Sequence, residues 1–427
     1  MRVWLLTIGE PLPIEPGKQR LHRTGIFASA LADRGIDVVW WTSTFRHAQK
    51  DKLYDRTTAV QVSERLKLWC LDAPAYRRNI SIRRIVSNRR IADEFRRYAP
   101  QEAAPDVIVA SYPVPELAAA GAAYARARNI PSVVDVRDLW PDIWSTILPE
   151  PLRPLANLAL TPFYRQSRNV LRAFDSIAAI TDEIVDWATA RAGRPRAPTD
   201  RTFPLAYPLP VYFDAELATA RKAWTHTFDA LRAPDLRICF FGNLGSRRTR
   251  IDVMIEAMRL LPEAIRPRVQ LVVCGVGEGL PALKQAAAGL PEIIFPGWVD
   301  GPGIKTLAET CSLGALPYPS DADFVRSIPN KAIEYLALGL PILTSLQGPV
   351  SDMIEKEGCG RLYGETDPAD MARVIAEVLD HPAELSALSA NAARLYREKF
   401  LATEVYGRYA ELLDGLARGA GAGPRRP

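Results

Sequence analysis

Two ionisable side chains, Lys331 and Glu334, make the stretch "RSIPNKAIEYLALGLPILTS" (326–345) a place where chemistry could occur. The stretch opens with basic and polar residues, continues as a short amphipathic helix, and ends with a glycine break and a buried strand. Lys331 precedes Glu334 by one helical turn, so the two side chains are neighbours on the helix. The residue types alone leave two interpretations open: a ligand site, or an acid that only solvates an exposed helix face.

A second candidate site follows a buried strand in "FFGNLGSRRTRID" (240–252). Gly242 and Gly245 would let the backbone approach a phosphate, and the next helix would offer N–H groups at its start. Three arginines that could add positive charge stand near that helix start: Arg247, Arg248 and Arg250. The strand-turn-helix context favours an anion site over an ordinary glycine turn with solvated arginines.

The following strand ends in a similar glycine turn, "CGVGEG" (274–279), in which Gly275 is the first glycine. No cation accompanies this turn, and a lone Gly-x-Gly often marks only a tight turn. Alone, it is weak support for a phosphate site.

Polar side chains also end a strand in the first half of the chain, within "VVDVRDLWPDIW" (133–144). Four of them are charged, and Trp140 and Trp144 stand beside them: Asp135, Arg137, Asp138 and Asp142. One interpretation places these groups at the edge of the sheet where ligands bind. In the other, Asp138 or Asp142 caps the following helix. The sequence does not choose between them.

The loop "SDADF" (320–324) suggests a metal site, because carboxylates often hold a divalent ion against a diphosphate. Asp321 and Asp323 are the two acids concerned. Aspartate is also common in polar loops for its own turn-forming reasons, and we favour that explanation. No metal or other cofactor is therefore expected.

Short β-branched runs alternate with longer amphipathic ones along most of the chain, which is typical of parallel α/β units. Strands are predicted over 3–8, 37–43, 66–71, 106–111, 132–136, 176–181, 237–245, 269–277, 293–299, 313–318 and 341–345. The pattern dissolves around 193–235, which is interpreted as a connection between domains, and the chain is predicted to be helical from about 367. The fold class is therefore α/β, with two doubly wound Rossmann-like domains that face a cleft and C-terminal helices that pack back toward the N-terminal domain.

The composition is that of a soluble globular protein, with 427 residues, 48% hydrophobic residues and 24% charged residues. We predict an N-terminal domain over 1–205, a second domain over 206–400, and a terminal helix with a flexible tail over 401–427. The five scattered cysteines argue against a zinc site or a disulfide framework. The first apolar run is short enough to be a strand rather than a signal peptide, so a cytoplasmic location is expected.

A basic run at 76–99, "YRRNISIRRIVSNRRIADEFRRYA", carries four Arg-Arg pairs. A solvated helix face is the commonest explanation of such a run. Docking on the anionic inner face of the cell membrane is the sharper one, at about 1 kcal/mol per basic residue near the surface. Nucleic acid is not an expected partner, because no binding motif accompanies the charge.

In these motifs the chain resembles the retaining glycosyltransferases of family 4, which have the two-domain fold called GT-B. The resemblance rests on "DVRDLWPD", "FFGNLG" and "SIPNKAIEYLALGLPIL", in that order, and spans nearly the whole chain. The branch it is most similar to builds bacterial surface polysaccharides such as O-antigen and capsule, including transferases of N-acetylated amino sugars. It implies an acceptor in the N-terminal domain and a nucleotide-diphosphate sugar in the C-terminal one.

The resemblance also implies roles for particular residues. Glu334 matches the last acid of a Glu-x7-Glu motif and would bind the ribose hydroxyls of the donor. Arg326 replaces the first acid, and Asn243 stands where the family has an arginine. The implied donor site comprises Gly242, Asn243, Gly245, Arg247, Arg248, Gly275, Val299, Arg326, Ser327, Lys331 and Glu334. Asp138 and Arg137 lie near the position of the family's N-terminal histidine and are the catalytic candidates.

The expected function is transfer of a hexosyl or N-acetylamino sugar from a nucleotide-diphosphate sugar to an acceptor hydroxyl with retention. Uridine is the expected base, and the acceptor would be a glycan or a lipid-linked glycan. Two alternatives stay open: a nucleotide-sugar epimerase of the same fold, and a non-catalytic subunit that only binds the donor. The second is motivated by Arg326, which replaces an acid of the family motif.

Overall fold

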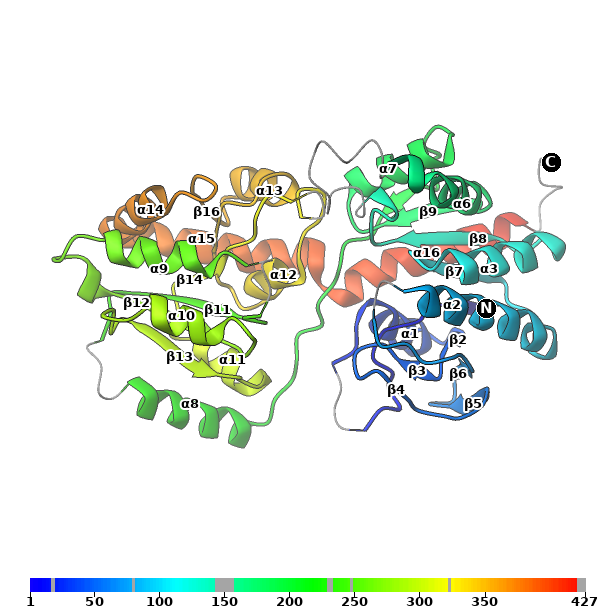
Figure 1. Cartoon of the computed structure of the whole chain (residues 1–427), viewed down its shortest axis with the longest axis horizontal. Helices are drawn as coiled ribbons and strands as arrows, with labels where there is room; N and C mark the ends of the chain where they lie inside the picture. The colour runs from blue at the N-terminus through cyan, green and yellow to red at the C-terminus, as the bar shows by residue number, and fades with distance from the viewer. Residues whose placement is uncertain are drawn as a thin grey trace. The chain divides into compact units, whose positions relative to one another are not determined.

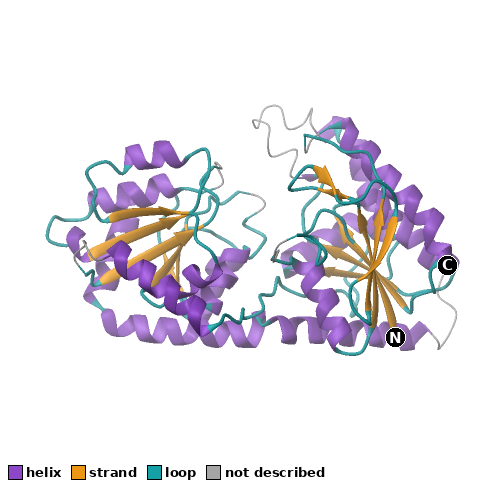
Figure 2. Ribbon diagram, turned by 90° about the horizontal axis from the view of Figure 1, so that it is seen from below, coloured by secondary structure: helices purple, strands orange, loops and turns teal. Residues whose placement is uncertain are grey.

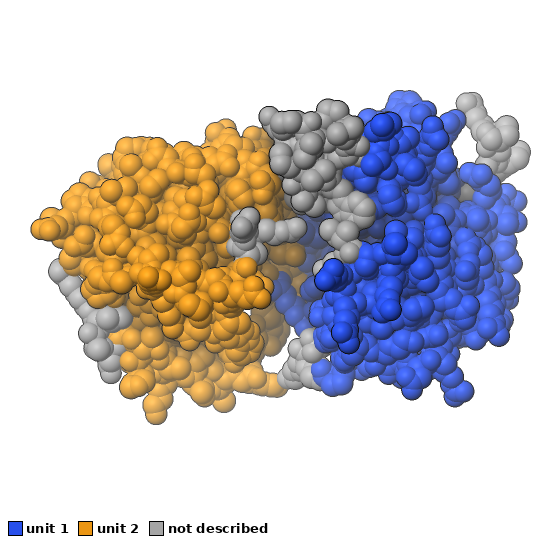
Figure 3. Space-filling model, in the orientation of Figure 1, with its two compact units in different colours: residues 1–206, 402–427 blue, residues 207–401 orange. Residues whose placement is uncertain are grey.

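A computed structural model describes residues 1–16, 20–78, 81–142, 157–228, 233–245, 249–321 and 324–420. The chain forms two compact units, shown in different colours in Figure 3. Unit 1 combines Met1–Ala206 with the segment that begins at Ala402, and unit 2 comprises Tyr207–Leu401. Within the described residues, no helix is long and apolar enough to cross a membrane.

The described strands of unit 1 form one large sheet in the order β10-β9-β8-β7-β1-β2-β6-β5 (Figure 1). Their bounds are β1 Arg2–Leu6, β2 Asp37–Ser43, β5 Thr58–Gln61, β6 Leu66–Leu71, β7 Val107–Tyr112, β8 Ser132–Val136, β9 Ser176–Ala179 and β10 Arg201–Thr202. All neighbours run parallel except β5, which pairs antiparallel with β6. A separate antiparallel pair follows β2 and consists of β3 Phe45–Arg46 and β4 Asp51–Lys52. The six strands predicted in this half are confirmed.

Helices cover both faces of this sheet (Figure 2). Their bounds are α1 Arg23–Asp33, α2 Ile82–Tyr98, α3 Pro115–Ala127, α6 Thr161–Arg172, α7 Asp182–Ala192 and α16 Ala402–Ala420. Alternate residues of β1 enter two different cores: Val3 and Leu5 pack with α1 and α16, while Trp4 and Leu6 pack with α2, α3, α6 and α7. Because both faces are buried, the strand is apolar throughout, as parallel strands usually are.

The C-terminal helix α16 packs on α1 of the N-terminal domain, as predicted. The ring of Tyr409 stacks on Phe203 with centroids 4.1 Å apart and on Phe27 at 4.5 Å. All three side chains are buried in one core of unit 1. The last helix of the chain therefore completes the hydrophobic core of the first domain.

Unit 2 is built on a parallel sheet in the order β13-β12-β11-β14-β15-β16. The bounds are β11 Leu236–Phe241, β12 Val269–Cys274, β13 Ile293–Gly297, β14 Leu313–Leu316, β15 Ile342–Thr344 and β16 Gly360–Leu362. Its described helices are α8 Asp214–Phe228, α9 Ile251–Leu260, α10 Leu280–Ala286, α11 Gly301–Ala308, α12 Asn330–Ala337, α13 Pro349–Glu357, α14 Pro368–Asp380 and α15 Pro382–Leu395. The strand order reverses between β11 and β14, and ligands of such sheets bind outside the carboxyl ends of the strands at this point.

The segment interpreted as a bare connection, 193–235, contains regular structure, so that interpretation is wrong in part. It includes β10 and the helix α8, which packs on α11. Trp224 is the buried residue of α8, and its indole N–H donates to the carbonyl of Gly303 at 2.8 Å. A helix held largely by one tryptophan shows little apolar periodicity, which explains why the pattern did not reveal it.

The stacking of Tyr409 predicts a contrast between two substitutions. Tyr409→Ala should destabilise unit 1 by about 3–5 kcal/mol, because the loss of a core aromatic ring leaves a cavity. Tyr409→Phe should cost far less, because the buried hydroxyl makes no hydrogen bond within the described residues. Urea unfolding followed by tryptophan fluorescence measures both. Equal losses in the two variants would show that the hydroxyl, not the stacking, holds the helix.

Candidate functional site

The candidate donor site of unit 2 lies at the carboxyl ends of its strands. The loop 242–245 follows β11, the described segments 317–321 and 324–329 lie between β14 and α12, and the two strands are neighbours. Parallel strands end at the same edge of a sheet, so these two loops meet there. The predicted donor residues of the two loops are thereby brought to one place.

Lys331 and Gly242 are in direct contact at this edge. A Cβ atom added to Gly242 would lie 2.5 Å from Cε and 2.7 Å from Nζ of Lys331. The ammonium group also lies 5.8 Å from the centre of the Phe240 ring. The end of the lysine side chain therefore lies against the backbone of Gly242, and a side chain at position 242 would displace the ammonium group.

The two glycine turns that follow β11 and β12 pack backbone against backbone. A Cβ on Gly275 would lie 1.8 Å from the carbonyl oxygen of Gly242, and the amide of Leu244 donates to the carbonyl of Val276 at 3.0 Å. Asn243 accepts a hydrogen bond from the amide of Gly245 at 2.7 Å through its side-chain oxygen. Gly275 and Asn243 therefore hold the shape of the loop around Gly242, whatever else they contact.

Glu334 is buried in α12, with 8% of its surface exposed. This excludes the alternative in which the acid only solvates an exposed helix face. The neighbouring Tyr335 anchors the helix: its hydroxyl donates to the carbonyl of Ala315 at 2.9 Å, and its ring packs edge-on against Phe241 at 5.0 Å. Gly314 makes room for that ring, since a Cβ there would lie 2.4 Å from it. Anchoring α12 on β14 in this way fixes Lys331 and Glu334 at the switch point.

The other predicted donor residues differ in their exposure to solvent. Arg326 is exposed, while Ser327 and Val299 are half-buried. Arg247 and Arg248 lie outside the described residues. Arg250 pairs with Asp252 at 2.9 Å, and its backbone amide donates to the carbonyl of Pro317 at 2.6 Å.

The N-terminus of α13 is a feature of this edge that sequence reasoning missed. Gly348 precedes the helix and approaches the loop after β14 so closely that a Cβ would lie 2.2 Å from the carbonyl oxygen of Val325. The first turn of α13 therefore lies next to the loop that carries Arg326, and its amides add positive potential there. The signal was the Gly-Pro pair at 348–349, which follows a strand and starts a helix.

In unit 1 two of the candidate residues, Asp135 and Arg137, belong to a network of charges at the edge where β1 and β8 end. Arg23 donates from Nε and Nη2 to the two carboxylate oxygens of Asp135, at 2.9 and 2.8 Å. Arg137 donates to the same carboxylate at 2.8 Å, to Glu10, and to the hydroxyl of Thr24 at 2.9 Å. Two arginines and two carboxylates thus compensate one another.

The electrostatics of this network favour ionised groups. Burial alone would raise the pKa of Asp135, but the charges of Arg23 and Arg137 outweigh it and lower the pKa to about 2. Burial likewise opposes the charge of Arg137, and Asp135 and Glu10 overcome it and raise its pKa. Arg137 is therefore a fixed cation whose three nitrogen atoms all donate within the network. Its catalytic role stays a prediction.

The rest of the "DLWPD" motif is held by α7. Arg191 donates to both carboxylate oxygens of Asp142 at 2.5 and 2.7 Å, and the indole N–H of Trp187 donates to one of them at 2.6 Å. Asp142 is thereby committed to joining its loop to α7. Asp138 is half-buried near Tyr112, whose pKa it helps to raise, although burial is the larger cause. Trp144 lies outside the described residues.

Among the described residues, no group of three or more His, Cys, Asp or Glu side chains could hold a metal ion. Asp321 is exposed in its loop, and Asp323 lies outside the described residues.

Two family models match the chain, one in each unit. Residues 22–204 match the model described as a glycosyl transferase 4-like domain, and residues 235–381 match the model described as glycosyl transferases group 1. Both units of the chain therefore match models of glycosyl transferase domains. The chain is 27% identical to the amylovoran biosynthesis glycosyltransferase AmsK of Erwinia amylovora over 193 residues. This match spans 44% of the chain and about half of its relative, 47%.

Solved structures of the same fold match nearly the whole chain. Sucrose-phosphate synthase from Thermosynechococcus elongatus superposes with a TM-score of 0.71 at 18% identity, over 98% of this chain and 99% of that one. HepE of Anabaena, solved with UDP-glucose, gives a TM-score of 0.63 at 16% identity, over 97% and 100% of the two chains. At these identities the likeness establishes the fold, and the prediction of two Rossmann-like GT-B domains is confirmed.

The charge network of unit 1 predicts a particular loss of stability in acid. The folded pKa of Asp135, about 2, lies below its ordinary value of 3.8, so its stabilisation is complete above about pH 4 and is lost as the pH falls toward 2. A shift of this size corresponds to roughly 2–3 kcal/mol. Asp135→Asn should therefore destabilise the protein at pH 7, by about 3–5 kcal/mol for a broken buried pair. The difference in the free energy of unfolding between variant and wild type should become smaller below pH 4.

Asp93→Asn provides the control, because Asp93 pairs with Arg96 on the exposed face of α2. That substitution should change stability by less than about 1 kcal/mol at every pH. Chemical unfolding of both variants from pH 7 to pH 3 makes the comparison. A gap for Asp135→Asn that stays constant with pH would contradict the assigned ionisation.

Proposed function

We propose that the protein transfers a sugar from a nucleotide-diphosphate sugar, bound in unit 2, to an acceptor hydroxyl, with retention of the anomeric configuration. The bond between the anomeric carbon and the diphosphate breaks, and a bond from the acceptor oxygen to that carbon forms. The acceptor proton passes to the departing diphosphate, so no nucleophile of the enzyme is needed. The observation that carries the proposal is the contact of Lys331 with Gly242 at the switch point of the sheet.

The charge at this edge suits a diphosphate leaving group. Negative charge grows on the diphosphate as its bond to the sugar breaks, and preorganised positive groups stabilise that charge best. Lys331 supplies a full charge beside the loop 242–245, and the first turn of α13 supplies partial charges. Arg247 and Arg248 join this set as the remaining proposed contacts.

Glu334 is proposed to bind the ribose. It lies one helical turn beyond Lys331 and is buried, so a ligand that reached it would be shielded from solvent. A carboxylate can accept hydrogen bonds from both ribose hydroxyls, and such charged bonds are strong. The spacing of Lys331 and Glu334 then suits a nucleotide whose phosphates contact Lys331 and whose ribose contacts Glu334, both on α12.

Uridine diphosphate is the proposed nucleotide, a choice supported by the UDP-glucose complex of the HepE structure. The proposed pathway is the synthesis of a bacterial surface polysaccharide or a lipid-linked glycan, supported by the amylovoran enzyme. A panel of nucleotide sugars tests the donor directly, because a ligand that binds the folded state raises the melting temperature. Release of sugar from the donor that gives the largest rise would then establish turnover.

Glu334→Gln should weaken the binding of UDP by about ten- to a hundredfold. The variant keeps the size of the side chain but loses a charged acceptor, at about 1.5–3 kcal/mol per hydrogen bond. Calorimetric titration with UDP and with uridine measures the loss, which should affect both ligands. Unchanged affinity in this variant would refute the ribose assignment.

Lys331→Met is the matched variant on the same helix. It should weaken UDP but leave uridine unaffected, because only the diphosphate meets the ammonium group. A loss for both ligands would instead mean that the substitution disturbs α12 as a whole.

We further propose that α2 docks on an anionic membrane surface. Ile82 and Val86 share a face of this helix and are 80% and 48% exposed, and the exposed Arg83 and Arg89 flank them. Exposed apolar side chains among arginines are what an interfacial helix presents to lipid.

The double variant Arg83→Gln, Arg89→Gln should bind vesicles of anionic lipid about thirtyfold more weakly at low salt, from about 1 kcal/mol per arginine. High salt should weaken the wild type in the same direction. Vesicle co-sedimentation measures the effect, and the pair Arg259→Gln, Arg418→Gln, on α9 and α16, is the control. A wild type that ignores anionic vesicles at low salt would end this proposal.

A further inference from the structure

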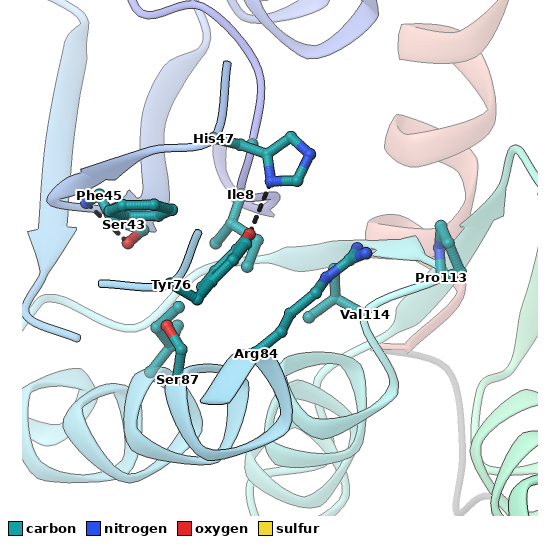
Figure 4. Close-up of a pocket in the computed structure, with 11 residues that line it drawn as sticks. Ile8, Ser43, Phe45, His47, Tyr76, Arg84, Ser87, Pro113 and Val114 are labelled. Carbon is teal, nitrogen blue, oxygen red and sulfur yellow. Dashed lines mark hydrogen bonds between the residues drawn. The ribbon is translucent and has the colours of Figure 1, made fainter. Parts of the chain in front are cut away.

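Unit 1 contains a cavity of about 170 Å³ at the carboxyl edge of its sheet (Figure 4). Ile8 follows β1, Val114 follows β7, and Ser43 ends β2, so the cavity lies at the switch point where the strand order reverses. Its volume is roughly ten times what one water molecule needs. None of the proposed donor residues contributes to it, whereas Tyr76, Arg84, Ser87 and Ile91 of the basic run 76–99 do.

The cavity wall carries donors and a positive charge. Arg84 and Ser87 enter it from α2, and Ser43 enters from β2. The hydroxyl of Ser87 is buried, with 1% of the residue exposed, and makes no hydrogen bond within the described residues. None of the described residues that line the cavity is acidic. A buried hydroxyl without a protein partner, placed beside a cation, calls for an acceptor that comes from a ligand.

His47 and Tyr76 form the opposite part of the wall (Figure 4). The imidazole Nδ1 and the phenol oxygen share a hydrogen bond of 2.6 Å, and Lys50 lies 5.1 Å from the centre of the Tyr76 ring. Burial, then the charges of Lys50 and Arg84, lower the pKa of His47 to about 4. The imidazole is therefore neutral at pH 7, and two cations already act on this space.

We propose that this cavity binds a phosphoryl group carried by the sugar acceptor. A phosphoryl group accepts hydrogen bonds in several directions, and Arg84, Ser43 and Ser87 offer donors from two different elements. The arginine fork suits such a group better than a lysine would. The inference rests on the proposed function in one respect only, namely that the ligand is the acceptor.

Two sources could bring this chemistry to the cavity: a soluble sugar phosphate, or the diphosphate that joins a glycan to a polyprenyl lipid. Glucose 1-phosphate and geranyl diphosphate represent the two in the experiment. The tighter of them identifies the source, and the proposal requires that at least one binds.

The test follows the His47 ring by NMR in full-length protein labelled at its four histidines. UDP is added first to occupy the donor site, and inorganic phosphate is then titrated at pH 7. Phosphate should shift the His47 resonance in a saturable way, and an anion next to the ring should raise its pKa above about 4. Sulfate, whose charge does not change over this range, serves for the pH series. A His47 resonance that ignores phosphate, glucose 1-phosphate and geranyl diphosphate overturns the proposal.

Arg84→Gln and Arg97→Gln form a matched pair, since Arg97 is an exposed arginine on the same helix α2 and lies outside the cavity. Arg84→Gln should weaken phosphate by about ten- to a hundredfold, and Arg97→Gln should leave it within about twofold. Ser87→Ala should weaken it by a smaller factor of about three to ten. Equal losses in the two arginine variants, or acetate binding as tightly as phosphate, would contradict a built phosphoryl site.

The same samples separate this inference from the proposed function. Calorimetry with UDP should give wild-type affinity in Arg84→Gln, because Arg84 lies in unit 1 and the proposed nucleotide site lies in unit 2. Glu334→Gln should lose UDP but keep the response of His47 to phosphate. A protein that binds UDP but shows no phosphate response refutes the cavity alone, and the reverse result refutes the donor site alone.

Discussion

The buried ion pair between Arg23 and Asp135 is the interaction on which the ligand edge of unit 1 depends. The pair joins the first residue of α1 to the last residue but one of β8. Arg23 also donates to the carbonyl of Pro204 at 2.9 Å. The Tyr406 and Tyr409 rings of α16 lie 6.0 Å from the same guanidinium. Charges this far from water are held only by full mutual compensation, so the geometry tolerates little variation. The positions of Arg137 and Glu10 depend on this pair, because Arg137 donates both to Asp135 and to Glu10.

Unit 2 organises its ligand edge by a different means, the close approach of backbones. The turn at Gly275 packs on the backbone of Gly242 too closely for a side chain, and Lys331 of α12 lies against Gly242. The hydrogen bond from the buried Tyr335 hydroxyl to the carbonyl of Ala315 holds α12 against β14. This contact fixes the positions of Lys331 and Glu334 on the helix. Charge pairs thus hold the ligand edge of unit 1, and close backbone packing at glycines holds that of unit 2.

The sequence predicted the parts of this structure that repeat along the chain. Apolar β-branched runs revealed the central strands, because both faces of a parallel sheet are buried. Short edge strands such as β5 and β16 carry too few residues for such a pattern, and α8 buries little besides Trp224. Lys331 and Glu334 could be found because one helix carries both.

The cavity at His47 and Arg84 could not be found in this way. Its walls come from segments that are far apart in the chain, and only the fold brings them together. The sequence likewise placed Arg137 and Asp142 among the candidate polar groups. It could not show that Arg137 pairs with Glu10, which follows β1, or that Asp142 pairs with Arg191 of α7.

The discontinuity of unit 1 has a consequence for how the chain is made. The first 206 residues leave the ribosome long before α16, whose contacts with α1 span most of the length of the chain. Until then Phe27 of α1 and Phe203 lack the tyrosine ring that covers them, and the contact that covers them joins segments very far apart in the sequence. Synthesis of unit 2 is thus an interval during which the N-terminal domain is unfinished and exposes apolar surface. Unit 1 cannot complete its core until α16 has been synthesised. If translation stopped before residue 402, unit 2 would have all its residues and unit 1 would lack α16.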